Sequence, residues 1–143
     1  MNVRPEQLRL YAVTDRAWSP DTEDFFRRIG AAIDGGATFV QLREKHMSRE
    51  NFLDEARRFV ALCRSRGVVS IINDNVEIAI EVGADGVHVG QDDMGAREAR
   101  RILGPAKIIG VSAHDPAECR PRLRKFDSGR ESGDQRVVLA PIQ

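Results

Sequence analysis

The sequence predicts an α/β fold in which parallel strands alternate with helices. Short runs rich in Val, Ile and Leu recur along the chain, and a segment of helical periodicity follows each of the first five. Several runs are almost continuously apolar, which is typical of strands buried on both faces. Since parallel strands are joined by right-handed crossovers, this order gives a parallel sheet covered by helices. The expected strands are Leu8–Val13, Thr38–Leu42, Val68–Ile72, Gly86–Val89 and Lys107–Val111, with a sixth at Val137–Ile142.

The expected helices begin and end at residues with suitable capping chemistry. The first begins at Ser19–Pro20, a serine N-cap followed by a proline in the first turn, and Gly35–Gly36 ends it. The second begins at Ser48 and ends at Gly67. The remaining helices are expected at Val76–Val82, at Ala96–Leu103 and from Asp115 onward.

The length bounds the architecture. With 143 residues the chain is expected to form one domain, residues 1–143, with a single core. The order of elements fits an open doubly wound sheet or a (β/α)8 barrel of the TIM type, and a complete barrel needs about 200 residues or more. The segment Arg120–Arg136 is highly charged and has weak apolar periodicity, so we expect an irregular polar segment there.

Composition excludes several classes of protein. Lys plus Arg and Asp plus Glu both total 22, and this balance argues against a dedicated nucleic-acid binder or a polybasic membrane protein. No apolar run approaches the roughly 20 residues of a membrane helix, and the first residues lack a signal-peptide core, so a cytoplasmic location is expected. Two cysteines, Cys63 and Cys119, exclude a disulfide framework.

Polar residues collect where the strands end, which is the side that carries binding sites in open sheets and barrels. Arg43 and Lys45 alternate along one segment, so both point to one side and suit a phosphate or diphosphate. Asp74 and Asp93 follow neighbouring strands, and carboxylates beside a diphosphate favour Mg²⁺. Amides such as those of Gln41 and Asn73 can read the edge of a heterocycle.

Each of these residues also has a purely structural interpretation. Arg43 and Lys45 can pair with Glu44 or Asp74, and Asp74 and Asp93 can serve as helix N-caps. Ser112, after the fifth strand, can be a turn residue. Packing alone is the favoured interpretation for Tyr11, Trp18 and His88.

At these residues the sequence resembles the thiamine phosphate synthase family. The matching segments, in the family's order, are Leu10–Asp15, Gln41–Lys45, Ile72–Asp74, Gly83–Asp93 and Ile109–His114. The resemblance implies a (β/α)8 barrel, of which this chain carries about five to six units out of eight. The expected fold is therefore an incomplete TIM-type barrel.

The resemblance also implies a reaction. The family joins 4-amino-2-methyl-5-(diphosphooxymethyl)pyrimidine to 4-methyl-5-(2-phosphooxyethyl)thiazole, forming thiamine phosphate and diphosphate in thiamine biosynthesis. Diphosphate leaves with the help of Mg²⁺, and the thiazole nitrogen captures a pyrimidine-stabilised methylene cation. Such chemistry needs electrostatic stabilisation more than a general acid or base. Matching positions imply that the pyrimidine diphosphate is held by Gln41, Arg43, Lys45, Asn73 and Ser112, and Mg²⁺ by Asp74 and Asp93.

The sequence departs from the family after its fifth strand. The family continues with two further strands and a phosphate-binding loop that this sequence lacks, so we expect the chain by itself to be inactive or nearly so. Two alternatives remain: a non-catalytic partial barrel that binds ligand or self-associates through its open edge, and a thiazole tautomerase-like relative. Asn73–Asp74 and Gln91–Asp93 argue against the tautomerase.

Overall fold

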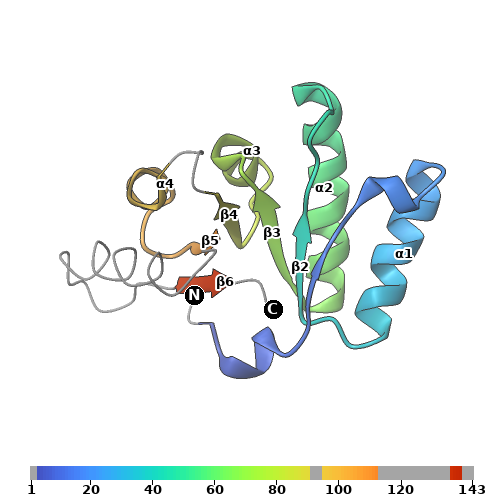
Figure 1. The fold of residues 1–143 in the computed structure, drawn as a ribbon, viewed down its shortest axis with the longest axis horizontal. Coiled ribbons are helices and arrows are strands. Elements are labelled where there is room, and N and C mark those ends of the chain that lie inside the picture. The colour runs from blue at the N-terminus through green and yellow to red at the C-terminus, as the bar shows by residue number, and fades with distance from the viewer. Residues whose placement is uncertain (1–2, 91–94, 113–135, 140–143) are drawn as a thin grey trace.

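Six parallel strands form one curved sheet, a half-barrel, in which each strand pairs with the next along the chain (Figure 1). The computed structural model describes residues 3–90, 95–112 and 136–139. The incomplete barrel of parallel strands predicted from the sequence is therefore confirmed. The strands are β1 (Tyr11–Val13), β2 (Phe39–Leu42), β3 (Val69–Asn73), β4 (Gly86–Val89), β5 (Ile108–Ser112) and β6 (Arg136–Leu139).

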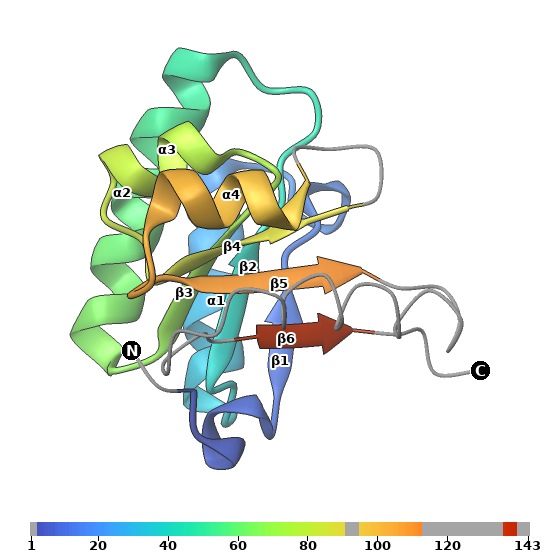
Figure 2. The same ribbon diagram turned by 90° about the vertical axis from the view of Figure 1, so that its left-hand side faces the viewer.

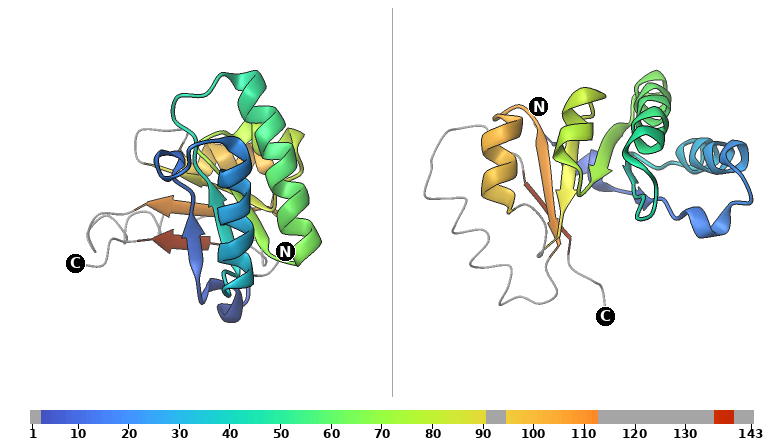
Figure 3. Two further views of the ribbon diagram at one scale, coloured as in Figure 1. Left: turned by 90° about the vertical axis from the view of Figure 1, so that its right-hand side faces the viewer. Right: turned by 90° about the horizontal axis from the view of Figure 1, so that it is seen from above.

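The α-helices of the described residues lie along the outer side of the sheet, as Figures 2 and 3 show from three directions. Two short 3-10 helices flank β1, one before it and one after it. The α-helices are α1 (Thr22–Asp34), α2 (Arg49–Arg66), α3 (Val76–Glu81) and α4 (Ala96–Leu103), and the 3-10 helices are η1 (Pro5–Leu8) and η2 (Arg16–Trp18).

The core lies on both faces of the sheet. Successive side chains of a strand point to opposite faces, so Val40 and Leu42 of β2 pack outward against the helices. Phe39, from the same strand, lies on the inner face and packs with a separate apolar group that Ile71 and Ile108 share. This inner group fills the space under the carboxyl ends of the strands and leaves the rim to polar residues.

Side-chain caps fix where the helices begin. The predicted start of α2 is confirmed, because Ser48 Oγ accepts a hydrogen bond from Asn51 N at 3.3 Å, and Gly67 ends the helix at a φ of 67°. The predicted start of α1 at Ser19–Pro20 is wrong. Asp21 is the cap, and its carboxylate accepts from Asp24 N at 2.8 Å. A carboxylate there also interacts favourably with the helix dipole.

Some strand boundaries differ from the prediction. β1 begins at Tyr11 because Pro5–Leu8 forms η1 instead of extending the strand. β3 and β5 each run one residue further than predicted, so Asn73 and Ser112 belong to strands. Trp18, predicted to pack, is 75% exposed at the end of η2, so that prediction is wrong.

The C-terminal predictions are tested only in part. β6 confirms the sixth strand, whereas the helix expected from Asp115 and residues 120–135 of the polar segment lie outside the described residues. The single-domain organisation stays a prediction. Among the described residues, no helix combines the length and apolar character that a membrane crossing requires.

Candidate functional site

Polar side chains form a layer on the inner face of the half-barrel, at the carboxyl ends of the strands. Gln41, Asn73 and His88 are buried there, with 3%, 9% and 5% exposure, and Ser112 joins them at the end of β5. Strand register accounts for the grouping, because Asn73 stands beside His88 and His88 beside Gly110 in the parallel ladder. Three predicted site residues, Gln41, Asn73 and Ser112, thus share one layer with His88 above the apolar inner group.

Gln41 is fixed by the first strand. Its Nε2 donates to the hydroxyl of Tyr11 at 2.9 Å, and the Tyr11 ring packs edge-on against Phe39 with centroids 4.8 Å apart. Burial raises the pKa of Tyr11 to about 12, and the hydrogen bond from Gln41 opposes this. The phenol therefore stays neutral, and the packing role predicted for Tyr11 is confirmed together with a polar role that the sequence did not indicate.

His88 lies against Ser112. Its Nε2 is 2.8 Å from Ser112 Oγ, and Gly110 leaves room for the ring, since a Cβ built on Gly110 would lie 2.4 Å from His88 Nδ1. Burial lowers the pKa of His88, which favours the neutral imidazole. The expected packing of His88 is confirmed, and its contact with Ser112 is new. The alternative that Ser112 is a turn residue is wrong.

Asp74 follows β3 in a conformation that few residues adopt. Its φ is 61°, and it is the one non-glycine residue with positive φ in the described part of the chain. Its N–H donates to His88 O at 2.8 Å, and Asn73 Nδ2 donates to its Oδ2 at 2.6 Å. The N-cap alternative for Asp74 is wrong, because Asn75 caps α3 by accepting from Ile78 N at 2.9 Å. The Asp74 carboxylate is exposed at the rim.

A single exposed carboxylate of this kind fits Mg²⁺, which usually binds through one or two protein carboxylates, waters and substrate phosphates. No group of three or more potential ligands occurs among the residues that the structure describes. Asp93, the second predicted ligand, lies outside those residues, as does Gln91. Among the described residues, Asp74 therefore supplies a carboxylate suited to a metal that is shared with a phosphate ligand.

Arg43 and Lys45 lie beyond the end of β2. The backbone N–H of Arg43 donates to Thr14 Oγ1 at 3.0 Å, which ties this segment to the end of β1. Within the described residues, no ion pair involves the Arg43 or Lys45 side chain. The alternative that they pair with Glu44 or Asp74 is therefore wrong, and both cations are available to an anion.

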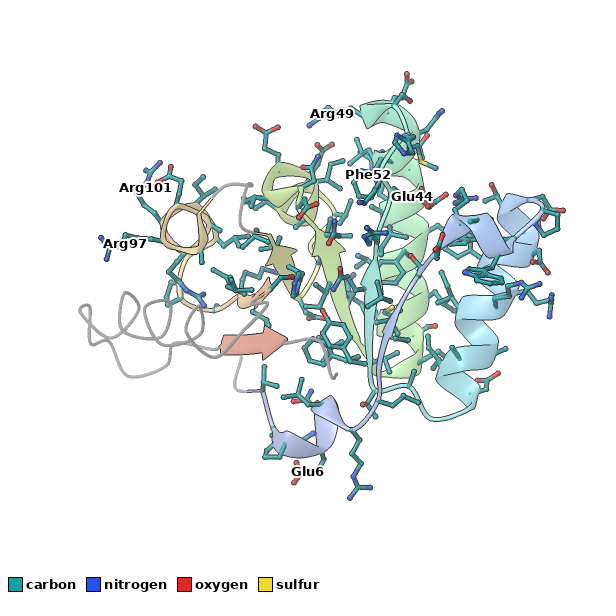
Figure 4. All side chains as sticks on the ribbon, in the orientation of Figure 1. Glu6, Glu44, Arg49, Phe52, Arg97 and Arg101 are labelled. Carbon is teal, nitrogen blue, oxygen red and sulfur yellow. The ribbon has the colours of Figure 1, made fainter. Side chains whose placement is uncertain are left out.

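Glu44 instead joins a partly buried charge cluster on the outer side of the segment, which we name the outer clamp: Arg16, Glu44 and Glu55. Arg16 Nε donates to Glu44 Oε1 at 2.9 Å, and its Nη2 donates to Glu55 Oε2. Both carboxylate side chains are only 6% exposed. Burial and the neighbouring Glu44 raise the pKa of Glu55 to about 7, although Arg16 opposes the shift. Figure 4 shows Glu44 near the end of β2, between η2 and α2.

Sequence reasoning missed the outer clamp. Its members are 28 and 39 positions apart, and nothing in the local pattern links them. One signal was available. Glu44 lies between Arg43 and Lys45, so alternation places it on the opposite side, toward the helices, and a carboxylate buried there needs a cationic partner.

Comparison with known proteins identifies the family. The family model described as "Thiamine monophosphate synthase" matches residues 10–127. The chain belongs to the thiamine monophosphate synthase family. This confirms the resemblance found in the sequence, and the matched region contains every predicted site residue.

Individual relatives and a solved structure of the same family support this assignment. A thiamine-phosphate synthase of Shouchella clausii is 45% identical over 135 residues, which are 94% of this chain and 61% of the relative. One of Chloroflexus aurantiacus is 49% identical over 116 residues, 81% of this chain and 53% of the relative. The solved structure of a thiamine phosphate pyrophosphorylase from Pyrococcus furiosus superposes with a TM-score of 0.78 at 28% identity, covering 96% of this chain and 61% of that one. The chain thus spans about half to six-tenths of the length of these relatives.

Proposed function

We propose that this chain forms the pyrimidine-diphosphate half of a thiamine phosphate synthase site. In the proposed reaction the pyrimidine methyl diphosphate condenses with the thiazole phosphate to give thiamine phosphate and diphosphate. The observation that carries the proposal is the pair of cations, Arg43 and Lys45, beside a buried polar layer at the carboxyl ends of the strands. Two cations that form no ion pair within the described part of the chain attract a diphosphate, and a fixed amide layer orients a heterocycle.

Each residue then has a role that follows from its chemistry. Arg43 offers a planar fork of donors to the diphosphate, and Lys45 adds a mobile point charge. Gln41, held by Tyr11, and Asn73, held against Asp74, present amides to the pyrimidine diphosphate. These groups stabilise negative charge that develops on the leaving diphosphate and do not act as acid or base.

The pyrimidine end of the substrate is assigned to Ser112. Its hydroxyl faces a histidine whose depressed pKa keeps the imidazole neutral, so His88 can donate to or accept from Ser112 without adding charge. A neutral environment at this end suits a heterocycle that must stabilise a methylene cation, because a cationic imidazolium there would oppose it.

Magnesium is the metal that these residues would bind. Asp74 holds a carboxylate at the rim, where the Asn73 amide fixes one of its oxygens. Asp93 is proposed as a second ligand from the sequence alone. When bound, the ion would neutralise charge on the diphosphate as it leaves. The chain's own contribution is to fix this carboxylate: Asp74 has a φ of 61°, and its N–H donates to His88 O at 2.8 Å.

The test measures thiamine phosphate formation and, separately, binding of the pyrimidine diphosphate by calorimetry with Mg²⁺. Asp74→Asn removes the charge but tolerates the same backbone conformation. Asp54→Asn, an exposed acid of α2 that pairs with Arg57 at 3.1 Å, is the matched control. Binding that is lost in Asp74→Asn and retained in Asp54→Asn supports the proposal.

The outcomes separate the rival functions. Product formation by the wild type identifies a synthase within these 143 residues. Binding without product identifies a partial barrel that binds the pyrimidine diphosphate without turnover. Absence of binding by a folded protein contradicts the proposed function.

A further inference from the structure

The outer clamp contacts the segment that carries the two cations on its helix-facing side, through Glu44. β2 ends at Leu42, and Arg43–Lys45 continue the chain beyond it. Glu44 points toward the helices, since the Arg16 side chain that bonds it also bonds Glu55 of α2, whereas Arg43 is two residues beyond Gln41, whose side chain lies in the inner polar layer. The Glu44 carboxylate is buried and accepts from Arg16 Nε at 2.9 Å. We propose that the outer clamp positions Arg43 and Lys45 for the diphosphate, which makes Glu44 and Arg16 positioning residues. This inference rests on the proposed function, because it concerns the substrate of the same site.

Burying the carboxylates of the outer clamp costs desolvation free energy, and the location of the clamp suggests why this cost is tolerated. One guanidinium faces two nearly buried carboxylates, so desolvation offsets much of the ionic attraction. Glu55 Oε1 is buried and has no hydrogen-bond partner among the described residues. Such a cluster is weak evidence for a role in stability alone. It lies directly under the backbone that presents the two cations, where a fixed geometry favours ligand binding.

Two anchors hold the segment, and both come from the end of β1. Thr14 Oγ1 accepts from the backbone N–H of Arg43 at 3.0 Å, and Arg16 holds Glu44 one residue later. Arg16 is itself fixed, because its guanidinium lies 4.1 Å from the centre of the Phe25 ring and Asp15 accepts from Ala17 N at 2.9 Å to close η2. A segment ordered before binding loses less conformational entropy when the ligand arrives.

A surface ion pair provides a matched control. Glu23 of α1 pairs with Arg58 of α2 through two bonds, at 2.6 and 2.9 Å, and both side chains are largely exposed. This pair joins the same layer of helices but lies outside the clamp. Replacing Glu23 also removes a carboxylate–arginine pair, but it does so without touching the segment that carries Arg43.

The experiment measures the Kd of the full chain for the pyrimidine diphosphate with Mg²⁺ by calorimetry. Glu44→Ala is expected to weaken binding about tenfold, as for other groups coupled to a binding residue. Glu44→Gln, which keeps an oxygen that can accept from Arg16, is expected to restore much of this loss. Glu23→Ala is expected to bind like the wild type. Equal Kd values for Glu44→Ala and the wild type would overturn the proposal.

A double-mutant cycle separates positioning from general destabilisation. In an Arg43→Ala background, Glu44→Ala is expected to weaken binding clearly less than tenfold, because one of the two cations through which it acts is gone. A full tenfold effect in that background would mean that Glu44 acts by another route, and the proposal fails. Thermal unfolding identifies variants that do not fold. If Glu44→Ala is one of them, Glu44→Leu, which fills the buried space without an oxygen that could accept from Arg16, takes its place in the cycle.

Amide hydrogen exchange keeps this test distinct from that of the proposed function. If the wild type binds no pyrimidine diphosphate, the proposed function fails, and exchange in residues 43–48 still reports whether the clamp orders the segment. Faster exchange there in Glu44→Ala than in Glu23→Ala supports the ordering role. Equal exchange in the two variants refutes it.

Discussion

Gly110→Ala is expected to disturb the polar layer through a single methyl group. A Cβ at this position would lie 2.4 Å from His88 Nδ1, 3.2 Å from Cγ and 3.3 Å from Cε1. Contact at 2.4 Å is well inside van der Waals separation, so the imidazole must move by roughly an ångström to reach an ordinary 3.4–4 Å contact. Such a movement takes Nε2 away from Ser112 Oγ, to which it is now 2.8 Å.

The expected cost combines two effects. Overpacking a well-packed site costs about 1–3 kcal/mol. Losing the hydrogen bond between His88 and Ser112 adds about 1 kcal/mol. We therefore expect Gly110→Ala to lower the free energy of unfolding by about 2–4 kcal/mol, a large part of the 5–15 kcal/mol typical of a domain. The same displacement is expected to weaken binding of the pyrimidine diphosphate, because Ser112 loses its orientation.

Urea unfolding measures the cost, and the chain supplies the control. Gly30 lies within α1 with nothing within 4 Å of a built Cβ, so Gly30→Ala is expected to stabilise the protein by up to about 1 kcal/mol. His88→Ala in the Gly110→Ala background is expected to remove the clash, so the two substitutions should combine to less than the sum of their separate effects. A Gly110→Ala protein within 0.5 kcal/mol of the wild type would refute this reasoning.

Three further predictions concern the side chains of Glu55, Asp74 and Cys63. Because the pKa of Glu55 is raised from 4.5 to about 7 by burial and by Glu44, the folded protein is expected to lose stability as the pH rises from 4.5 to 7. Glu55→Gln should therefore raise the Tm at pH 8 but not at pH 5, and an equal change at both would contradict this. Asp74→Ala should lower the unfolding free energy by about 1 kcal/mol relative to Asp74→Asn, because alanine is strained at a φ of 61°; equal stabilities in urea would exclude the strain. Burial raises the pKa of Cys63 to about 12, so in a Cys119→Ser background Ellman's reagent should label it only on unfolding, and rapid labelling in native buffer would oppose that.

Much of the fold was predictable because its signals are local. Runs such as Val68–Ile72 are apolar at every position except Ser70, and a strand covered on both faces buries them. The caps of α2 at Ser48 and Gly67 are likewise chemical signals that act over a few residues. The start of α1 was mispredicted because Ser19 and Asp21 both have capping chemistry, and the local pattern does not rank them.

The site was predictable in position but not in its contacts. The end of each strand carries polar residues in the sequence, and the parallel fold brings those ends to one rim. Which of these residues are held, and by what, depends on register: Gln41 meets Tyr11 from a neighbouring strand, and His88 meets Ser112. A prediction from periodicity assigns a face to His88 but not a partner, and so it gave packing alone.

The sequence by itself determined the order of parallel strands, the family to which the chain belongs, and the two cations Arg43 and Lys45 at the end of the second strand. Only the tertiary structure decided that Glu44 turns away from them to meet Arg16 and Glu55. The reason is physical. A residue's face follows from the period of its own element, whereas ion pairs between residues 28 and 39 positions apart depend on how a loop, a strand end and a helix pack together.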